Sequence, residues 1–175
     1  MAFAQPSSRP TRTIPEWESL DYHMGTMIRP AKRAAARRIP HVLTFRKLVA
    51  RAPDPAQAIE TVRQGLPASA IDEAVAYMSV AQKDLLAALR IPMSTFHRRL
   101  AANEALSPGE SEKVLRLGDI ARRAEHTFGN AKAARDWLTA ENLALGGSPL
   151  SLIDTEAGAA QVRRVLATLD YGGTA

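Results

Sequence analysis

The stretch SPGESEKVLRLGDIARRAEHTFG, residues 107–129, contains the start, the buried face and the end of one long helix. Ser107 is a good N-cap, Pro108 suits the first helical position, and Glu110 completes a capping box. Gly129 then supplies a helix stop. An apolar stripe at helical spacing is formed by Val114, Leu117, Ile120, Ala121, Ala124 and Phe128. The stretch therefore predicts an amphipathic helix from about 108 to 128.

Shorter helices are expected on the C-terminal side of this stretch. Asn130 can cap the next helix, and a glycine-rich turn, LGGSP, follows at 145–149. Thr155 can cap a last helix, which is expected to end near Leu169. Residues 170–175 would then form a short mobile tail.

Four helices are expected on the N-terminal side, at about 55–64, 67–78, 81–89 and 93–102. Gly65 is a plausible stop for the first of them. No strand-like alternation of useful length occurs in the sequence, and alanine and leucine, which favour helices, dominate its apolar residues. The predicted fold is all-α.

The first segment, residues 1–51, reads as a basic, largely irregular arm. It holds 10 Lys and Arg against 3 Asp and Glu, and residues 79–102 hold 4 against 1, whereas the other segments are acidic. Two separate basic segments are typical of a protein that binds a polyanion. The alternative is a basic tail with no partner. Long helices in the arm are broken by Pro6, Pro10, Pro15, Pro30 and Pro40.

The helices at 81–89 and 93–102 are joined by about three residues, the spacing of a helix-turn-helix. On a helical wheel Phe96 and Leu100 share an inner face, and Arg98 lies almost opposite. Short polar residues and arginine on the outer face suit a recognition helix in a DNA groove. The alternative is an ordinary helical hairpin with solvated arginines. The candidate DNA contacts are Lys83, Ser94, Thr95, His97, Arg98 and Arg99.

Other chemistry finds little support in the sequence. The absence of cysteine excludes disulfides and thiolate catalysis, and the four histidines lack a metal-ligand spacing. There is no phosphate-binding glycine loop, no secretory signal and no apolar run long enough to cross a membrane. We therefore expect a cytoplasmic protein that is not an enzyme and holds no metal or cofactor.

Several motifs together resemble one family. They are LLAALRIPMSTFHRRLA (85–101), LSPGESEKVLRL (106–117) and NLALGGSPLSLIDTEAGAAQV (142–162). From about 58 to 172 the chain is similar to the Xre/MbcA/ParS-type antitoxins of bacterial type II toxin–antitoxin systems.

The resemblance implies a helix-turn-helix unit at 52–102 and a toxin-binding domain at 103–175. Members neutralise a RES-domain toxin that consumes NAD⁺, and they repress their own operon by binding its DNA. The tail would enter the toxin's cleft. The candidate toxin contacts are Gly146, Gly147, Asp154, Asp170, Tyr171 and Gly172. The alternatives are a stand-alone helix-turn-helix regulator, which uses 103–175 to dimerise, and a structural helical adaptor.

One helix-turn-helix covers little DNA, so a homodimer is expected. Its interface is expected to include part of the long helix's stripe, namely Val114, Leu117, Ile120, Ala121 and Ala124. Two departures from the family pattern concern the backbone. Arg90 and Ser79 stand where the family usually has glycine. A non-glycine residue in a left-handed conformation costs about 1 kcal/mol. The turn before the recognition helix is therefore expected to be differently shaped, or DNA binding to be weakened.

Overall fold

The computed structural model describes residues 43–172, which lie within one compact unit. No β-strand occurs in this range, so the predicted all-α fold is confirmed. The rest of the arm, including the stretch AKRAAARR at residues 31–38, and the last three residues lie outside the described part. The helices are α1 (Phe45–Ala50), α2 (Pro55–Gln64), α3 (Ser69–Met78), α4 (Gln82–Ala88), α5 (Met93–Ala101), α6 (Pro108–Phe128), α7 (Ala131–Thr139), the 3₁₀ helix η2 (Pro149–Leu152) and α8 (Glu156–Gly172).

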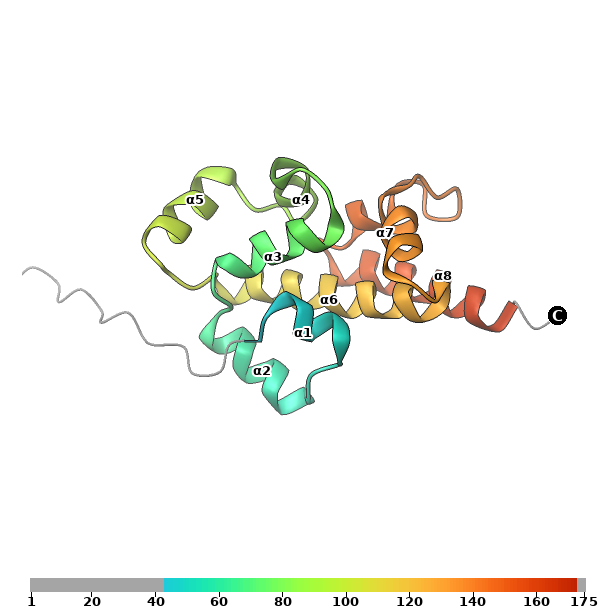
Figure 1. Ribbon diagram of the computed structural model, residues 1–175, viewed down its shortest axis with the longest axis horizontal. Coiled ribbons are helices and arrows are strands. Elements are labelled where there is room, and N and C mark those ends of the chain that lie inside the picture. The colour runs from blue at the N-terminus through green and yellow to red at the C-terminus, as the bar shows by residue number, and fades with distance from the viewer. Residues whose placement is uncertain (1–42, 173–175) are drawn as a thin grey trace, which may run out of the picture. The chain divides into compact units, whose positions relative to one another are not determined.

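The helix α6 runs through the middle of the fold and contacts α1, α2, α3, α7 and α8 (Figure 1). Its predicted ends are confirmed. The Ser107 N–H donates to Glu110 Oε2 at 2.6 Å, and the Glu110 N–H donates to Ser107 Oγ at 3.3 Å. Gly129 ends the helix with φ 74°. Because both ends are fixed locally, the sequence alone could place this helix.

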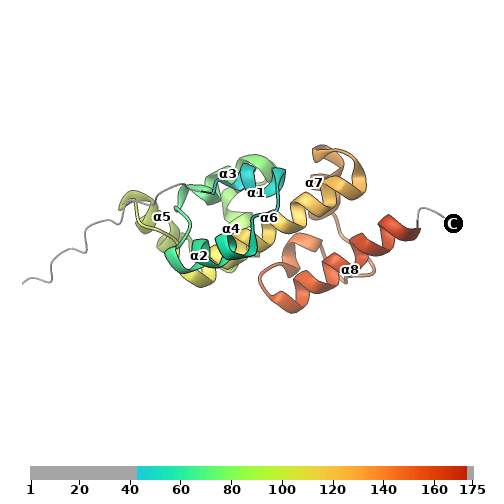
Figure 2. The same ribbon diagram turned by 90° about the horizontal axis from the view of Figure 1, so that it is seen from below.

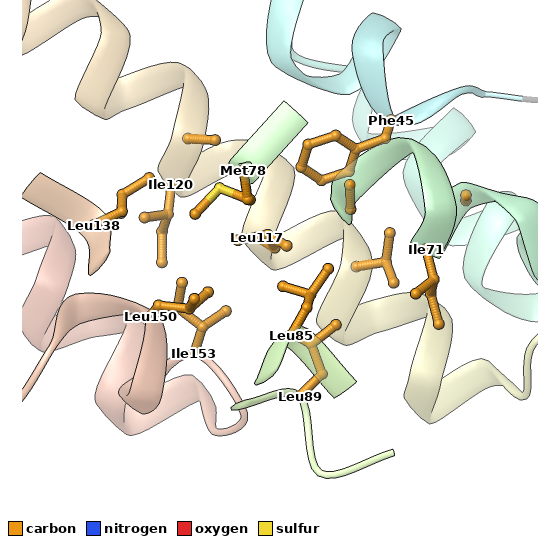
Figure 3. Close-up of a cluster of buried hydrophobic side chains, with 14 of the residues drawn as sticks. Phe45, Ile71, Met78, Leu85, Leu89, Leu117, Ile120, Leu138, Leu150 and Ile153 are labelled. Atoms are coloured by element: carbon orange, nitrogen blue, oxygen red, sulfur yellow. The ribbon is translucent and has the colours of Figure 1, made fainter. Parts of the chain in front are cut away.

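One continuous core joins residues from α1 to α8 (Figure 3). Leu117 and Ile120 of α6 lie at its centre and are fully buried. Side chains from the helix-turn-helix, such as Leu85, pack on one side of them, and Leu138 of α7 packs on the other (Figure 3). The segment that carries the helix-turn-helix and the segment that follows it therefore share one core.

The prediction of an irregular arm over 1–51 is wrong for residues 45–50, which form α1. Phe45 is fully buried, its N–H donates to a carboxylate oxygen of Glu73 at 2.8 Å, and its ring lies 5.5 Å from that of Tyr77. Leu48 packs against Gly118, where an added Cβ would lie 2.8 Å from the Leu48 Cβ. A helix of six residues is too short to show a period, so only its tertiary contacts reveal it.

Two further expectations are corrected. Leu100, placed on the inner face of α5, is 37% exposed, and among the residues of α5 only Phe96 is buried. The last helix does not end near Leu169, because α8 continues through Gly172. Asp170 and Tyr171 are therefore helical and not part of a mobile tail. Glycine at the end of a helix lowers its stability but does not forbid it.

The expected dimer interface on α6 is also wrong. Each residue assigned to it has no exposed surface within the single chain, so none is available to a second copy. These residues are Val114, Leu117, Ile120, Ala121 and Ala124, each 0% exposed. They form the core of the single chain, and a homodimer would need another surface.

Both positions at which the chain departs from the family's glycines have left-handed backbone. Ser79 has φ 54° and ψ 37° as the C-cap of α3, and Arg90 has φ 51° in the turn between α4 and α5. The turn thus keeps the conformation that glycine favours and accepts the strain of a side chain. Asn103 is a third such residue, with φ 51°.

Replacing Ser79 with glycine is expected to raise the free energy of unfolding by about 0.5–1 kcal/mol, because the Cβ strain is removed. For a chain of this size the gain corresponds to about 1–4 °C in Tm. Thermal unfolding followed by circular dichroism measures it. Ser79→Ala is the matched control, since it keeps the Cβ and should not gain. Equal Tm values for the two variants would contradict the assignment of strain.

Candidate functional site

The helix-turn-helix is formed by α4 and α5. The turn between them is closed by a hydrogen bond from the Ile91 N–H to the Leu86 carbonyl at 2.9 Å, and Ile91 is buried. Arg90 points away from this turn, with its side chain 75% exposed and its Nε 3.6 Å from Asp154 Oδ2. The predicted spacing therefore gives two helices docked through a tight turn.

The outer face of α5 is polar and accessible. Ser94, His97 and Arg98 are exposed, and Thr95 is half-buried. Arg98 Nη1 lies 2.9 Å from Glu104 Oε2, and these two side chains are 60% and 46% exposed. An ion pair this exposed contributes little stability, so Arg98 can exchange Glu104 for another partner at small cost.

Arg99 lies in different surroundings from Arg98. Its side chain is only 21% exposed, and its Nη1 donates to the Ala105 carbonyl at 2.8 Å. Its Nε lies 3.4 Å from Glu110 Oε2, so it reaches the capping box of α6. These contacts hold the end of α5 against the start of α6. Lys83, by contrast, is exposed in the first turn of α4.

The predicted partner-contact residues fall in separate places. Gly146 and Gly147 form a tight turn in which Gly146 has φ 68° and the Asn142 N–H donates to the Gly147 carbonyl at 3.1 Å. Asp154 lies before α8, and Tyr171 lies in its last turn. With a rise of about 1.5 Å per residue, these two residues are about 25 Å apart. The structure therefore groups Asp154 with Arg90 and not with the C-terminal residues.

The sequence analysis missed two exposed apolar side chains near these positions. Leu143 stands at the tip of the turn before Gly146 and is 102% exposed. Leu169 is 45% exposed, and Tyr171, two residues further along α8, is 82% exposed. The signal for Leu143 in the sequence is a leucine inside a polar, glycine-rich turn. Residues 167–172 at the end of α8 are all exposed.

A buried arginine fixes the start of α8 on α6. The Arg116 side chain is 8% exposed, and its Nη1 donates to the carbonyls of Ile153 and Asp154 at 3.0 and 3.2 Å. Its Nε pairs with Glu156 at 3.0 Å, and its Nη2 pairs with Glu112 at 3.1 Å. No pattern in the sequence singles out this arginine, since all of its partners except Glu112 lie about 40 residues further along the chain.

A second set of charges extends this link. Arg163 of α8 contacts Asp119 at 3.2 Å and Glu156 at 2.7 Å. Burial raises the pKa of Asp119, but hydrogen bonds from Arg122, Arg123 and Arg163 outweigh it and hold that pKa below its ordinary value. The hydrogen bond from Arg163 lowers the pKa of Glu156. Both carboxylates thus add stability that is present above about pH 4 and is lost as the pH falls through their lowered pKa values.

A close backbone contact explains why the first turn of α8 has glycine at position 158. A Cβ at this position would lie 2.1 Å from the Leu152 carbonyl oxygen. The backbone of α8 therefore approaches η2 more closely than any residue with a side chain permits. The D-T-x-x-G motif at 154–158 combines this contact with a cap, because the Gly158 N–H donates to Thr155 Oγ1 at 3.1 Å.

Neither a metal site nor a membrane span is found in the described range. Residues 43–172 contain no group of three or more histidine or carboxylate side chains placed to hold a metal ion. None of the helices described is long and apolar enough to cross a membrane.

Comparison with known families places both parts of the structure. Residues 57–118, which include α4 and α5, match the antitoxin Xre-like helix-turn-helix domain, and residues 123–172 match the antitoxin Xre/MbcA/ParS C-terminal toxin-binding domain. The fold is thus that of a helix-turn-helix protein with a helical partner-binding domain. The chain belongs to the Xre/MbcA/ParS antitoxin family.

Individual relatives agree with this assignment. A protein of Sphingobium sp. (strain YBL2) named Prs ADP-ribosylating antitoxin is 31% identical over 131 residues, which cover 69% of this chain and 82% of the relative. Antitoxin Xre of Yersinia enterocolitica is 29% identical over 116 residues, covering 65% and 78%. Antitoxin Xre of Pseudomonas putida is 30% identical over 83 residues, covering 47% and 52%.

Proposed function

We propose that this antitoxin binds and neutralises a RES-domain toxin that consumes NAD⁺, and that it represses its own operon through the helix-turn-helix. The match of residues 123–172 to a toxin-binding domain carries the first part. The name of the Sphingobium relative refers to ADP-ribosylation, a reaction that also consumes NAD⁺. The protein acts without catalysis of its own, in the cytoplasm, where its operator lies.

The toxin surface that we propose lies on the C-terminal part of the chain. Its main contacts are the exposed end of α8 with Asp170, Tyr171 and Gly172, and the turn with Gly146 and Gly147. An exposed tyrosine offers apolar area and a hydroxyl, which suits a concave cofactor cleft. Asp154 is also proposed as a toxin contact. We assign it a second role in holding the turn between α4 and α5, because it forms an ion pair with Arg90 of that turn.

The experiment that tests neutralisation measures NAD⁺ consumption by a purified RES-domain toxin with and without this antitoxin. Turnover is expected to stop when the antitoxin is added at a one-to-one ratio or above. A stand-alone transcriptional regulator would bind promoter DNA but leave NAD⁺ turnover unchanged. That result would contradict the proposed toxin and leave the helix-turn-helix assignment intact.

The DNA surface that we propose is the outer face of α5 with Lys83 of α4. Ser94, Thr95 and His97 lie on this face beside Arg98. Arg98 can reach a guanine O6 and N7 in the major groove, and Lys83 suits a phosphate. We give Arg99 the role of holding α5 in place, because both of its contacts lie within the protein. We also propose a homodimer, since such readers dock on two half-sites.

Replacing Arg98 with alanine is expected to weaken operator binding by about 1–3 kcal/mol, roughly 5-fold to 150-fold, and to relax specificity at one base pair. Lys83→Ala should weaken binding to all sequences alike and reduce the salt slope by about one. Binding isotherms on the protein's own promoter at several salt concentrations measure both effects.

Two controls accompany this test. Arg164→Ala removes an exposed arginine of α8 and should change operator affinity little. Glu104→Ala frees Arg98 from its ion pair and should not weaken binding. Operator affinity that is unchanged in Arg98→Ala would overturn the assignment of α5 as the recognition helix.

A further inference from the structure

A groove of about 490 Å³ lies between α2 and α8, above α6 and the end of α1. Figure 2 shows α2 and α8 both lying along α6. The apolar part of its lining is formed by Leu48, Pro53, Ile59, Val62 and Leu115. The ion-paired charges of α6 and α8 also line it, among them Asp119, Glu156 and Arg163. A lining that combines apolar and charged side chains suits an amphipathic helix as occupant.

The helix α2 forms the edge of this groove and is unusually exposed. None of its ten residues is buried, and Ile59 at its middle is 52% exposed. A helix of this length has little stability of its own and depends on packing of an apolar face. The apolar face of α2 is therefore only half used within the single chain.

The charges of α2 are complementary to those of a second, antiparallel α2. Asp54 caps the N-terminal end, and Arg63 lies exposed in the last turn on the same face as Ile59. If Ile59 faces Ile59 of a second copy, Arg63 lies opposite Pro55 of that copy and beside its Asp54. Arg63 of each copy then lies beside Asp54 of the other copy, so the pair contains two such contacts between opposite charges.

We propose that two copies of this chain pair through this groove, with their α2 helices antiparallel and Ile59 on the two-fold axis. The proposal rests on the homodimer proposed above and names its surface. The stripe of α6 cannot serve, because it is internal to the single chain. A two-fold contact of this kind is self-complementary, as the symmetry of a dimer that reads two half-sites requires.

A single cysteine tests the axis directly, because the chain contains no cysteine. Ile59→Cys places two thiols across the axis, within the Cβ separation of about 4 Å that a disulfide needs. In oxidised glutathione most of this variant is expected to run as a covalent dimer of twice 19.0 kDa on a denaturing gel. Leu143→Cys is the matched control, since that position is 102% exposed and lies away from the groove. It should stay mostly uncrosslinked.

Sedimentation of the full chain at tens of micromolar is the second measurement. The unmodified protein is expected to be a dimer, and Ile59→Glu to be a folded monomer of 19.0 kDa. Leu143→Glu should remain a dimer. Arg63→Glu and Asp54→Lys should each weaken the dimer about 10-fold or more, and an equimolar mixture of the two should restore it, because both contacts then pair opposite charges.

The outcomes separate the surface from the homodimer itself. If Ile59→Glu is still a dimer and Ile59→Cys does not form the crosslink, the groove is not the dimer surface, although the protein is still a homodimer. A protein that is monomeric at all concentrations overturns both. A monomer that binds the toxin but loses it on Ile59→Glu assigns the groove to the toxin and overturns the second copy as its occupant.

Discussion

Replacing Arg116 with methionine is expected to lower the free energy of unfolding by about 2–4 kcal/mol, the largest effect on stability that we predict for a single side chain. The carbonyls of Ile153 and Asp154 would lose their donor, and burial keeps water from replacing it fully. The loss of the ion pairs with Glu156 and Glu112 would cost less free energy, because these side chains are 63% and 58% exposed and stay solvated. The cost therefore comes from the carbonyls and not from the ion pairs.

Urea unfolding measures this loss, and hydrogen exchange locates it. Exchange should rise first at the start of α8, because Arg116 fixes that end. Arg164→Met, which removes an exposed arginine of α8, is the control and should change the free energy of unfolding by less than about 0.5 kcal/mol. Arg116→Lys should lose an amount of stability between those of Arg116→Met and Arg164→Met, since one ammonium cannot reach all four partners. A loss below 1 kcal/mol in Arg116→Met would contradict the role given to this arginine.

Truncation after Leu169 is expected to remove most of the neutralisation of the toxin, by about 30-fold or more in affinity. The removed segment carries Tyr171, and the loss of a central aromatic contact typically costs 2 kcal/mol or more. Folding should persist, because residues 170–172 are exposed and the core contacts of α8 end at Leu166. Inhibition of NAD⁺ turnover by full-length and truncated protein is the measurement.

Promoter binding by the truncated protein supplies the control for this prediction, since it should match that of the full chain. Tyr171→Asp tests the same contact in an intact helix and should also weaken inhibition. If the truncated protein inhibits as well as the full chain, the end of α8 is not the inhibiting element. Inhibition would then come from the body, where the exposed Leu143 turn is the next candidate.

The predictions from sequence succeeded where structure is decided by neighbouring residues. The capping box at Ser107, the stop at Gly129 and the cap at Asn130 involve atoms a few residues apart. The short turn before α5 is likewise local, and it fixed the helix-turn-helix. The outermost residues of α5 followed from helical geometry alone, which is why Ser94 and Arg98 are exposed as expected.

The sequence by itself thus determined most of the helices, the caps at Ser107, Asn130 and Thr155, the all-α class and the resemblance to the family. Only the tertiary structure showed that α1 belongs to the core, that the stripe of α6 is internal, and that α8 continues through Gly172. It also separated Arg98, which is exposed, from Arg99, which is tied to Glu110. These facts depend on contacts between segments far apart in the chain, such as Leu48 with Gly118 and Arg116 with Ile153. A local pattern contains no information on which distant backbone will cover a side chain, and burial decides its role.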